Sequence, residues 1–388
     1  MSERLDNASA RRLLEHFGRR RQHVLSFIRS LCEVESPSGD LAGSRTVSDL
    51  LASAAEAVPG VVSTERIETP GGYGVHFRAR AFGGAGRPLL LLGHTDTVHP
   101  KGTLAARPWR EEAGRIYAPG VFDMKASCAV AVEALRACAE LGLRPGRPVV
   151  LLLTCDEETG SFSGRALVEE EARRAEYVLV LEPPAPGGRA KTARKGTGLF
   201  TLKAEGRAAH AGLDPEKGAS AVHEIARQIG RVCALAEPSR GTTVNVGVVH
   251  GGTRANVVAE QASAEIDVRF ATEEEARRVE RAIRGAQPFD RRVRLAVEGG
   301  INRPPLERTP RVAELFERAR AAAAALDFEL GEASVGGASD GNFAAACGAA
   351  VLDGLGVDGD GAHAAHEHIE AEAVVRRGAL LAALVATL

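Results

Sequence analysis

The chain has 388 residues, of which 49 are basic and 51 are acidic, giving a formal net charge of −2. A single hydrophobic core stops growing at about 250 to 300 residues, so the length predicts two domains. The charges nearly cancel and no Lys/Arg cluster is interleaved with aromatic residues, which argues against nucleic acid and against an anionic membrane as partners.

Helical and strand patterns alternate over most of the chain. Apolar residues recur at helical spacing from about residue 9 to 34, which predicts an opening helix. Short unbroken apolar runs occupy residues 89–92, 149–153 and 178–181. Such runs are typical of strands buried on both faces of a mainly parallel sheet. Further helical patterns cover residues 125–141, 164–174 and 311–325. The alternation predicts the α/β class, with helices flanking the sheet.

A different pattern covers residues from about 196 to 300. Apolar and polar residues alternate there in three segments, whose apolar positions are Phe200, Leu202 and Ala204, then Val244, Val246 and Val248, then Ala264, Ile266 and Val268. Period two is typical of an antiparallel sheet with one solvated face. Because such a sheet is not expected to continue a buried parallel one, we assign residues 1–194 and 301–388 to a catalytic domain and residues 195–300 to an inserted α+β domain.

Polar residues suited to chemistry stand where the predicted strands end. The three apolar runs are followed by His94 and Asp96, by Glu157 and Glu158, and by Glu182. In open α/β sheets, ligands bind at the carboxyl ends of the strands. Two more candidates are Asp123, which opens the long helix, and His363, in a loop near the C-terminus.

Imidazole and carboxylate groups without thiolates are the ligands expected of a hydrolytic zinc ion with an open coordination position. Two metals are favoured over one on a count of charges. The three negative charges of Asp123, Glu158 and Glu182 leave one positive charge when two Zn²⁺ are bound, and a single hydroxide would neutralise it. In an extended segment His94 and Asp96 fall on the same side, so Asp96 is expected to accept a hydrogen bond from the second ring nitrogen.

The adjacent Glu157 and Glu158 are expected to point apart, so that one binds metal while the other holds the attacking water as general base. A base without a metal bond is the group whose pKa burial can raise towards neutrality. Cys155 beside this pair is interpreted as a small buried hydrophobe, because no histidine partner for a nucleophile follows nearby.

The motifs resemble those of the metallopeptidase clan that contains glutamate carboxypeptidase, aminoacylase, acetylornithine deacetylase and succinyl-diaminopimelate desuccinylase. The resemblance covers nearly the whole chain, and the pattern is most similar to that of glutamate carboxypeptidase. The matching strings are Gly93-His94-Thr95-Asp96-Thr97-Val98, Gly-x-x-Asp-Met-Lys at residues 120–125, Glu157-Glu158-Thr159-Gly160, Leu181-Glu182-Pro183, residues 206–212, Gly251-Gly252-Thr253 with Asn256, and Ser339-Asp340-Gly341.

The resemblance implies two Zn²⁺ ions per subunit, which Co²⁺ or Mn²⁺ could replace, with Glu157 as the base. The implied ligands are His94 and Glu182 for one ion, Glu158 and His363 for the other, and Asp123 as the bridge. It also implies that the inserted domain is a lid that forms a homodimer.

The same resemblance implies roles for four residues in or beside the inserted domain. His210 would reach a partner's active site and stabilise the oxyanion. Asn256 and Arg269 would recognise the carboxylate of the substrate, and Arg303 is a further candidate for that role. Arg269 also has another interpretation, because it shares a strand face with Asp267 and could belong to a solvated charge ladder.

The C-terminal ligand also has an alternative. His366 lies in the same loop as His363, but Glu367, four residues after His363, matches the spacing found in the family. We therefore assign the ligand role to His363 and keep His366 as the alternative.

The six cysteines are far apart and form no Cys-x-x-Cys pair, which predicts a reducing, cytoplasmic setting. The N-terminal residues lack the apolar segment of a signal peptide, and no run approaches the roughly 18 apolar residues of a membrane span. We expect a protein that is neither exported nor anchored.

The expected activity is zinc-dependent hydrolysis of an amide bond adjacent to a carboxylate, in a small-molecule amide or a peptide. Within the same class the alternatives are an N-acyl-amino-acid deacylase and a biosynthetic amidohydrolase acting on a modified metabolite. From another class, the alternative is a non-catalytic binding protein on the same fold, because fold by itself does not fix function.

Overall fold

The computed structural model describes residues 5–388. Two compact units divide the chain. The first comprises the described residues through Thr192, together with Arg308–Ser334 and Ser339–Leu388, and the second comprises Ala193–Glu307 and Val335–Ala338. The roles of catalytic domain and lid that the sequence assigns to such units stay predictions.

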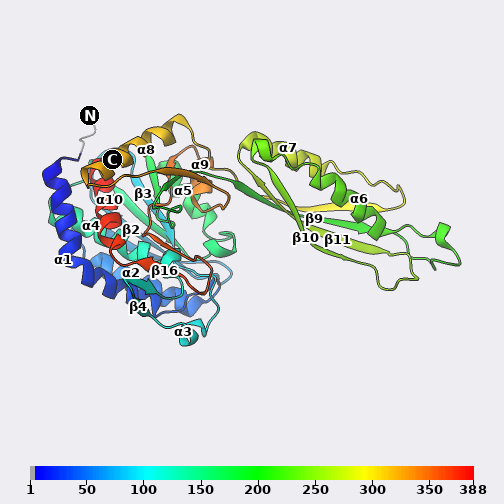
Figure 1. Cartoon of the computed structure of the whole chain (residues 1–388), viewed down its shortest axis with the longest axis horizontal. Coiled ribbons are helices and arrows are strands. Elements are labelled where there is room, and N and C mark those ends of the chain that lie inside the picture. Colours follow the sequence, from blue (N-terminus) through cyan, green and yellow to red (C-terminus); the bar gives the residue numbers. More distant parts are fainter. Residues whose placement is uncertain (1–4) are drawn as a thin grey trace. The chain divides into compact units, whose positions relative to one another are not determined.

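The first unit is built on a six-stranded sheet (Figure 1). In spatial order its strands are β1 (Val61–Glu68), β2 (Val75–Ala81), β6 (Val149–Thr154), β3 (Leu89–His94), β7 (Tyr177–Val180) and β14 (Ala350–Leu352). Four of them, from β6 to β14, are parallel, whereas β1 and β2 add to β6 in antiparallel fashion. The predicted α/β class with a mainly parallel sheet is confirmed. The edge strands β1 and β2 were not predicted, because they carry charged residues and form no unbroken apolar run.

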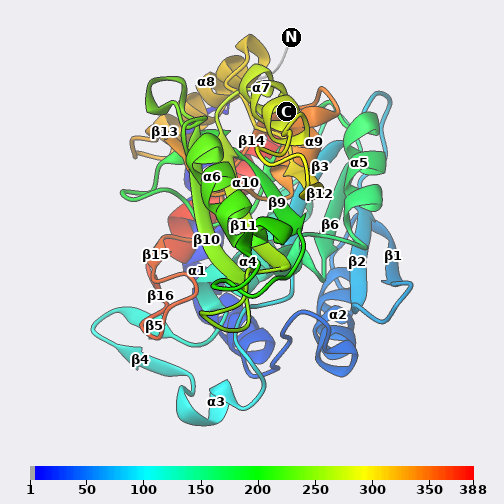
Figure 2. The same ribbon diagram turned by 90° about the vertical axis from the view of Figure 1, so that its right-hand side faces the viewer.

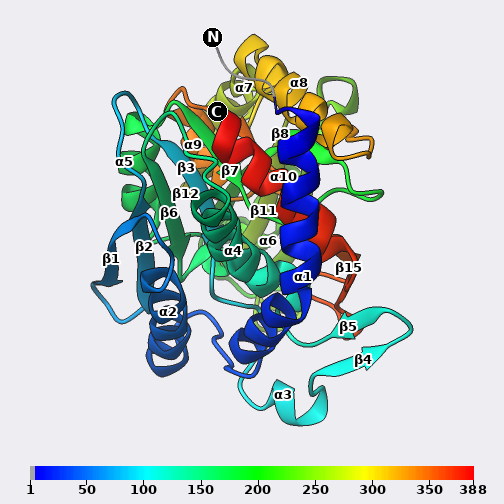
Figure 3. The same cartoon turned by 90° about the vertical axis from the view of Figure 1, so that its left-hand side faces the viewer.

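Helices cover this sheet, so β3 and β6 are buried along their whole length. The helices of the first unit are α1 (Asn7–Cys32), α2 (Leu41–Glu56), α3 (Thr103–Ala106), α4 (Ala126–Glu140), α5 (Arg165–Arg174), α8 (Pro310–Ala325), α9 (Gly341–Ala346) and α10 (Ala373–Thr387). Figure 3 shows α1, α4 and α10 packed against one another in front of the sheet. Figure 2 shows α5 from the opposite side, where it packs with α9.

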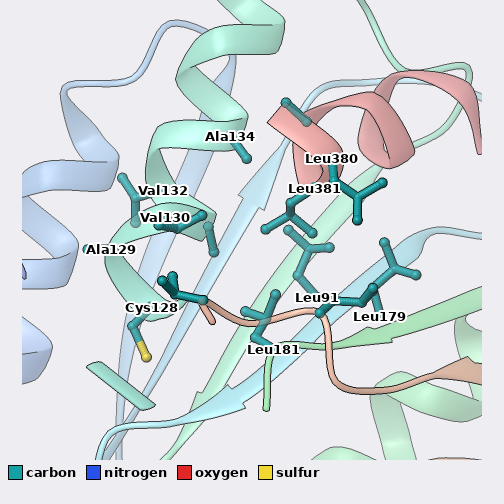
Figure 4. Packing of buried hydrophobic residues seen from close by; sticks show 14 of the residues in the cluster. Leu91, Cys128, Ala129, Val130, Val132, Ala134, Leu179, Leu181, Leu380 and Leu381 are labelled. Carbon is teal, nitrogen blue, oxygen red and sulfur yellow. The ribbon is translucent and has the colours of Figure 1, made fainter. Parts of the chain in front are cut away.

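Leucines from strands and helices form the centre of the first core. In Figure 4, Leu380 and Leu381 of α10 lie over Leu91 and Leu179 of the sheet. Each of these four side chains is almost completely removed from solvent. This packing fixes the central strands, at whose ends the candidate polar groups stand.

The described residues form two further, smaller sheets. One contains β15 (Gly359–Asp360), β16 (His368–Glu370), β5 (Arg115–Tyr117) and β4 (Arg110–Glu112), and the other pairs β13 (Glu332–Val335) with β8 (Ala190–Arg194). The first of these sheets joins the segment after His363 to the segment before Asp123, through the pairing of β16 with β5.

The second unit is an antiparallel sheet with two helices along one face (Figure 1). Its strands, in spatial order, are β10 (Thr243–Gly251), β11 (Gln261–Phe270), β9 (Gly196–Glu205) and β12 (Arg294–Arg303), and its helices are α6 (Ala221–Cys233) and α7 (Glu273–Arg284). It has its own core, to which Phe200, Ile266 and Ile283 contribute. The predicted α+β unit with an antiparallel sheet is confirmed.

One strand of this sheet departs from the predicted alternation. Val246 pairs with Ile266, but the next paired residue is Val248, which lies opposite Glu265, so the register shifts at Gly247. A bulge inserts one residue and moves every later side chain to the other face. Val248 is accordingly exposed, and the prediction that it continues the apolar face of Val246 is wrong.

No helix within residues 5–388 combines the length and the apolar character needed to cross a membrane.

The core predicts a clear difference between two substitutions in the sheet. Leu91→Ala removes a fully buried side chain, so we expect the free energy of unfolding to fall by about 2–5 kcal/mol. Val62→Ala, at a position that is 73% exposed, should change it by no more than about 0.5 kcal/mol. Urea denaturation of both variants measures this, and an equal loss for the two would contradict the assignment of the core.

Candidate metal centre

The topology of the first sheet brings the candidate polar groups to one edge. Strand β3 ends at His94, which lies opposite Thr154, the last residue of β6. The turn that carries Glu157 and Glu158 follows β6, and Glu182 follows β7 on the other side of β3. Because β6, β3 and β7 are parallel neighbours, their carboxyl ends meet at one edge.

Asp123 lies between the two histidines. Its Oδ1 is 3.2 Å from Nε2 of His94, and its Oδ2 is 3.5 Å from Nε2 of His363. Glu182 approaches the first of these histidines, with Oε1 3.4 Å from His94 Nε2. Glu158 approaches the second, with Oε2 3.1 Å from His363 Nε2. The two carboxylate oxygens of Asp123 therefore face two separate imidazole–carboxylate pairs.

The loop of His363 presents this histidine and not His366 to the acidic groups. His363 has a φ of 64°, in the left-handed region, and the loop is closed by a hydrogen bond from Ala364 N to Gly361 O. His366 is exposed, and its carbonyl accepts a hydrogen bond from His368 Nδ1. The geometry favours His363 as the ligand that the sequence proposed.

Glu157 and Glu158 belong to different groups of candidate ligands, and Glu157 is buried. Its carboxylate lies with His94 and Glu182 in a group whose candidate ligand atoms are all within 4.8 Å of one another. Glu158 instead lies with His94 and Asp123 in a second such group. The two glutamates thus fall in different candidate groups, which share His94; that they point apart stays a prediction.

Asp96 does more than the sequence suggests. The ring Nδ1 of His94 hydrogen-bonds the main-chain oxygen of Asp96 at 3.0 Å and lies 3.4 Å from its carboxylate. That carboxylate also accepts hydrogen bonds from the backbone N–H groups of Glu157 and Glu158, at 3.2 and 3.1 Å, and from the hydroxyl of Ser38 at 2.6 Å. Asp96 therefore orients both the first histidine and the turn that bears the glutamates.

The charges of the centre shift the pKa values of its groups. Burial disfavours the charged form of His94, but hydrogen bonds to Asp123, Asp96 and Glu182 outweigh it and raise the pKa of this imidazole well above its usual range. Hydrogen bonds to Asp123 and Glu158 raise the pKa of His363 to about 10. The imidazoles hold their protons among carboxylates, where a metal cation would compete with those protons.

These residues fit a metal site. Glu158 Oε1 is buried and has no hydrogen-bond partner, which is costly for a carboxylate oxygen unless another group satisfies it. Carboxylates gather around two imidazoles, of which His94 is buried and His363 is about half exposed, and buried charges such as those around His94 are paired or coordinate metals. The donor set contains nitrogen and oxygen but no thiolate, as in hydrolytic metal centres.

Glu367 is a residue whose role the sequence did not reveal. Its buried Oε1 accepts hydrogen bonds from the backbone N–H groups of Phe122 and Asp123, at 2.9 and 3.0 Å. Its Oε2 accepts from Gly120 N at 2.8 Å and from His99 Nε2 at 2.6 Å. Glu367 thus clamps the Asp123 segment to the loop of His363. The spacing from His363 was the only signal in the sequence.

The clamp has a second layer. Arg107 donates to Nδ1 of His99 at 3.1 Å, which leaves the Nε2–H of His99 to donate to Glu367. Arg107 also donates to the carbonyl of Ala364, next to His363, at 3.2 Å. No motif pointed to His99 or Arg107.

Asp340 supports the turn that bears the two glutamates. Its carboxylate accepts hydrogen bonds from Thr154, at 2.9 Å, and from Ser161. These residues stand on either side of Glu157 and Glu158. The Ser339-Asp340-Gly341 string marked this segment in the sequence, but it did not indicate what Asp340 contacts.

The predicted catalytic residue His210 and the predicted substrate-binding residue Asn256 lie together in the second unit. His210 forms a backbone bridge with Val257, and Ala211 N donates to the carbonyl of Asn256 at 3.0 Å. The ring Nδ1 of the exposed His210 accepts from Gly212 N and Leu213 N, at 3.1 Å each. In the neutral ring, Nε2 is therefore the nitrogen that carries the proton. The contribution of His210 and Asn256 to a site stays a prediction.

The two predicted arginines lie on the strands that flank β9, one on each side of Thr197. Arg269 makes two hydrogen bonds of 2.8 Å to Asp267. These contacts agree with the alternative interpretation, in which Arg269 belongs to a charge ladder on one strand face. Arg303 is buried at the end of β12, opposite Thr197. Recognition of a substrate carboxylate by either arginine stays a prediction.

The clamp predicts that Glu367→Gln weakens metal binding. The side-chain amide nitrogen of glutamine cannot accept a hydrogen bond, so at least one backbone N–H that Glu367 now binds would lose its acceptor. We expect the affinity for Zn²⁺ to fall about 10- to 100-fold, as for other residues that orient metal ligands. A competition titration with a chromophoric chelator measures this. The control is Glu314→Gln, at an exposed position on α8, and equal affinities for the two variants would refute the clamp.

The raised pKa values predict proton release on metal binding. His363, with a pKa raised to about 10, is protonated at neutral pH, whereas metal binding needs the neutral ring. Affinity for Zn²⁺ should therefore rise with pH between about pH 6 and pH 9, and protons should appear in weakly buffered solution. Isothermal titration in buffers of different ionisation enthalpy counts them. His363→Gln should release fewer protons and His366→Gln as many as the unchanged protein; the reverse would reassign the ligand.

Known sequences resemble this chain over most of its length. The sequence model of peptidase family M20/M25/M40 matches residues 90–387. Carboxypeptidase G2 of Pseudomonas sp. strain RS-16 is 30% identical over 369 residues, which cover 93% of this chain and 88% of that protein. Succinyl-diaminopimelate desuccinylase of Delftia acidovorans is 28% identical over 344 residues, covering 83% and 87%.

A solved structure shares the fold. The aminopeptidase PepT of Bacillus cereus superposes with a TM-score of 0.79 at 22% sequence identity, covering 95% of this chain and 98% of that one. The resemblance that the motifs carried is confirmed by these matches. The chain belongs to peptidase family M20/M25/M40 and is a metal-binding hydrolase.

Proposed function

We propose that the protein is a di-zinc hydrolase that cleaves an amide bond adjacent to a carboxylate, in the manner of a glutamate carboxypeptidase. The observation that carries the proposal is Asp123, whose two oxygens face His94 on one side and His363 on the other. Carboxypeptidase G2, which this chain resembles along 93% of its length, supports the choice among the activities of the family.

The ligand roles follow the two halves of the centre. His94 and Glu182 would hold one Zn²⁺, His363 and Glu158 the other, and Asp123 would bridge them. Zinc bound there would lower the pKa of a water molecule and polarise the carbonyl of the amide.

Glu157 supplies the proton transfer. It removes a proton from the attacking water and delivers it to the leaving nitrogen, so that a neutral amine departs. Its carboxylate lies beside His94 and Glu182, at the edge where the water would be held. Asp96 fixes the backbone of Glu157 through the 3.2 Å hydrogen bond to its N–H.

The second unit is proposed as the lid and as the interface of a homodimer. The Nε2–H of the exposed His210 is suited to donate to the oxyanion that forms on the substrate carbonyl. Asn256 and Arg303 are proposed to recognise the carboxylate of the substrate. A cytoplasmic location is proposed because all six cysteines are free thiols.

Deacylation of a neutral N-acyl amino acid is the second candidate. The pairing of Arg269 with Asp267 favours it, because the positive charge of this arginine is already neutralised and is less available to an acidic substrate. The desuccinylase that the chain resembles removes an acyl group, as its name states.

A hydrolysis screen separates the two candidates. Zinc-loaded protein is tested against N-acyl amino acids and dipeptides ending in Glu, Asp or neutral residues, with a chelated sample as control. Chelator-sensitive release of acidic C-terminal residues supports the carboxypeptidase, and release of neutral residues alone supports the deacylase. No hydrolysis in the panel would favour a specialised metabolite or a binding protein.

Glu157→Ala tests the role of the base. We expect kcat to fall about 10²- to 10⁴-fold, which is the usual contribution of general acid–base catalysis, while zinc content stays near two ions per chain. Zinc is measured by atomic emission and kcat on the best substrate of the screen. Loss of zinc in proportion to activity would show that Glu157 is a ligand instead.

A further inference from the structure

A buried histidine stands where the turn of the two glutamates leaves the sheet. The pairing of β2 with β6 runs up to Phe77 and Leu153. Two residues farther along, Cys155 donates its backbone N–H to the ring Nδ1 of His76 at 3.1 Å. His76 lies on β2 and is buried. A side chain of β2 therefore accepts the N–H of the first residue after β6.

The other ring nitrogen of His76 contacts the far end of the same segment. Its Nε2 is 3.3 Å from Oγ of Ser163, whose hydroxyl donates to Asp156 at 2.8 Å. Because Nδ1 accepts the N–H of Cys155, the neutral ring carries its proton on Nε2 and donates it to Ser163. Burial supports the neutral form, because it lowers the pKa of His76 despite the opposing effect of nearby carboxylates, chiefly that of Asp156.

These contacts close residues 155–163 into a loop. The carboxylate of Asp156 also accepts the backbone N–H groups of Ser163, at 2.6 Å, and of Gly164, at 3.2 Å. The two ends of the segment are thus joined to each other, and the ring of His76 contacts both ends. Both glutamates of the centre lie inside this loop, between the two points that the ring contacts.

The spacing of His76, Cys155 and Asp156 would also allow them to hold a metal ion, but their contacts favour a different role. Both ring nitrogens of His76 and both carboxylate oxygens of Asp156 already have hydrogen-bond partners. Burial also raises the pKa of the Cys155 thiol, which opposes the thiolate that a metal would need. We interpret the group as a support of the turn.

We propose that His76 is a positioning residue of the metal centre. Through its two contacts it sets the orientation of the turn from which Glu157 reaches the attacking water and Glu158 reaches the metal. This inference rests on the proposed function, in which Glu157 is the base. A displacement of about 1 Å can cost about 100-fold in rate, so a contact that fixes the backbone two residues before the base bears on the chemical step.

Two substitutions separate the two contacts of the ring. In His76→Asn the amide oxygen is as many bonds from the backbone as Nδ1, so it can still accept the N–H of Cys155. In His76→Gln the amide nitrogen is as many bonds away as Nε2, so it can donate to Ser163, but the acceptor for Cys155 is lost. At saturating zinc we expect kcat to fall about 10- to 100-fold in His76→Gln and no more than about threefold in His76→Asn, with KM unchanged in both.

His16→Asn is the matched control. His16 is also a buried histidine of the first unit, and its Nε2 lies 2.7 Å from Oε1 of Glu133, a contact that the shorter asparagine cannot reach. The substitution should lower the stability in urea but leave kcat unchanged, because the lost contact joins α1 to α4 and not to the turn. Equal kcat values for His76→Asn and His76→Gln, or the same loss in His16→Asn as in His76→Gln, would overturn the inference.

Zinc affinity gives a second readout that needs no turnover. Because Glu158 is on the same turn, His76→Gln should lower the affinity for Zn²⁺ about 10- to 100-fold, as for other residues that orient ligands, and His76→Asn should not. Competition with a chromophoric chelator measures this. If the unchanged protein hydrolyses no substrate of the screen, that result counts against the proposed function alone, and equal zinc affinities of the two variants would then refute the positioning role.

A pair of variants at Ser163 replaces these if His76→Gln does not fold. Ser163→Ala removes the hydroxyl that contacts the ring of His76, whereas Ser163→Thr keeps a hydroxyl there. Lower zinc affinity and lower kcat in Ser163→Ala, both restored in Ser163→Thr, would support the inference. Unchanged values in Ser163→Ala would overturn it.

Discussion

Buried negative charge is the constraint on which the rest of the structure depends. Asp123, Glu158 and Glu182 converge on two histidines at the end of a parallel sheet, and carboxylates so close together in a buried setting repel one another unless cations lie between them. Protonated imidazoles partly offset that repulsion, as the raised pKa values of His94 and His363 show. Bound metal ions would offset it more completely.

Residues other than the candidate ligands hold the ligand-bearing segments in place. The buried carboxylates of Asp96 and Glu367 are not candidate metal ligands. Asp96 contacts the ring of the candidate ligand His94, and both carboxylates accept hydrogen bonds from the backbone of segments that carry ligands. A carboxylate that accepts several N–H groups fixes the path of the chain as well as its charge. Such residues explain how loops can carry ligands with the precision that a metal centre needs.

The segment that bears Glu157, Glu158 and Phe162 is held by two buried aspartates. Asp340 and Asp156 anchor the segment that bears Phe162, and the same segment begins with the turn of Glu157 and Glu158.

The sequence by itself determined the class of fold and the candidate ligands. Unbroken apolar runs identify buried parallel strands, and polar residues directly after them must meet at one edge, so His94, Glu158 and Glu182 could be placed before any coordinates. The tertiary structure alone decided contacts between distant segments. Glu367 binds the backbone of Asp123 across 244 residues, and Asp340 accepts a hydrogen bond from Thr154 across 186 residues. Periodicity reports which face of an element is buried, but these partners depend on how separate elements pack.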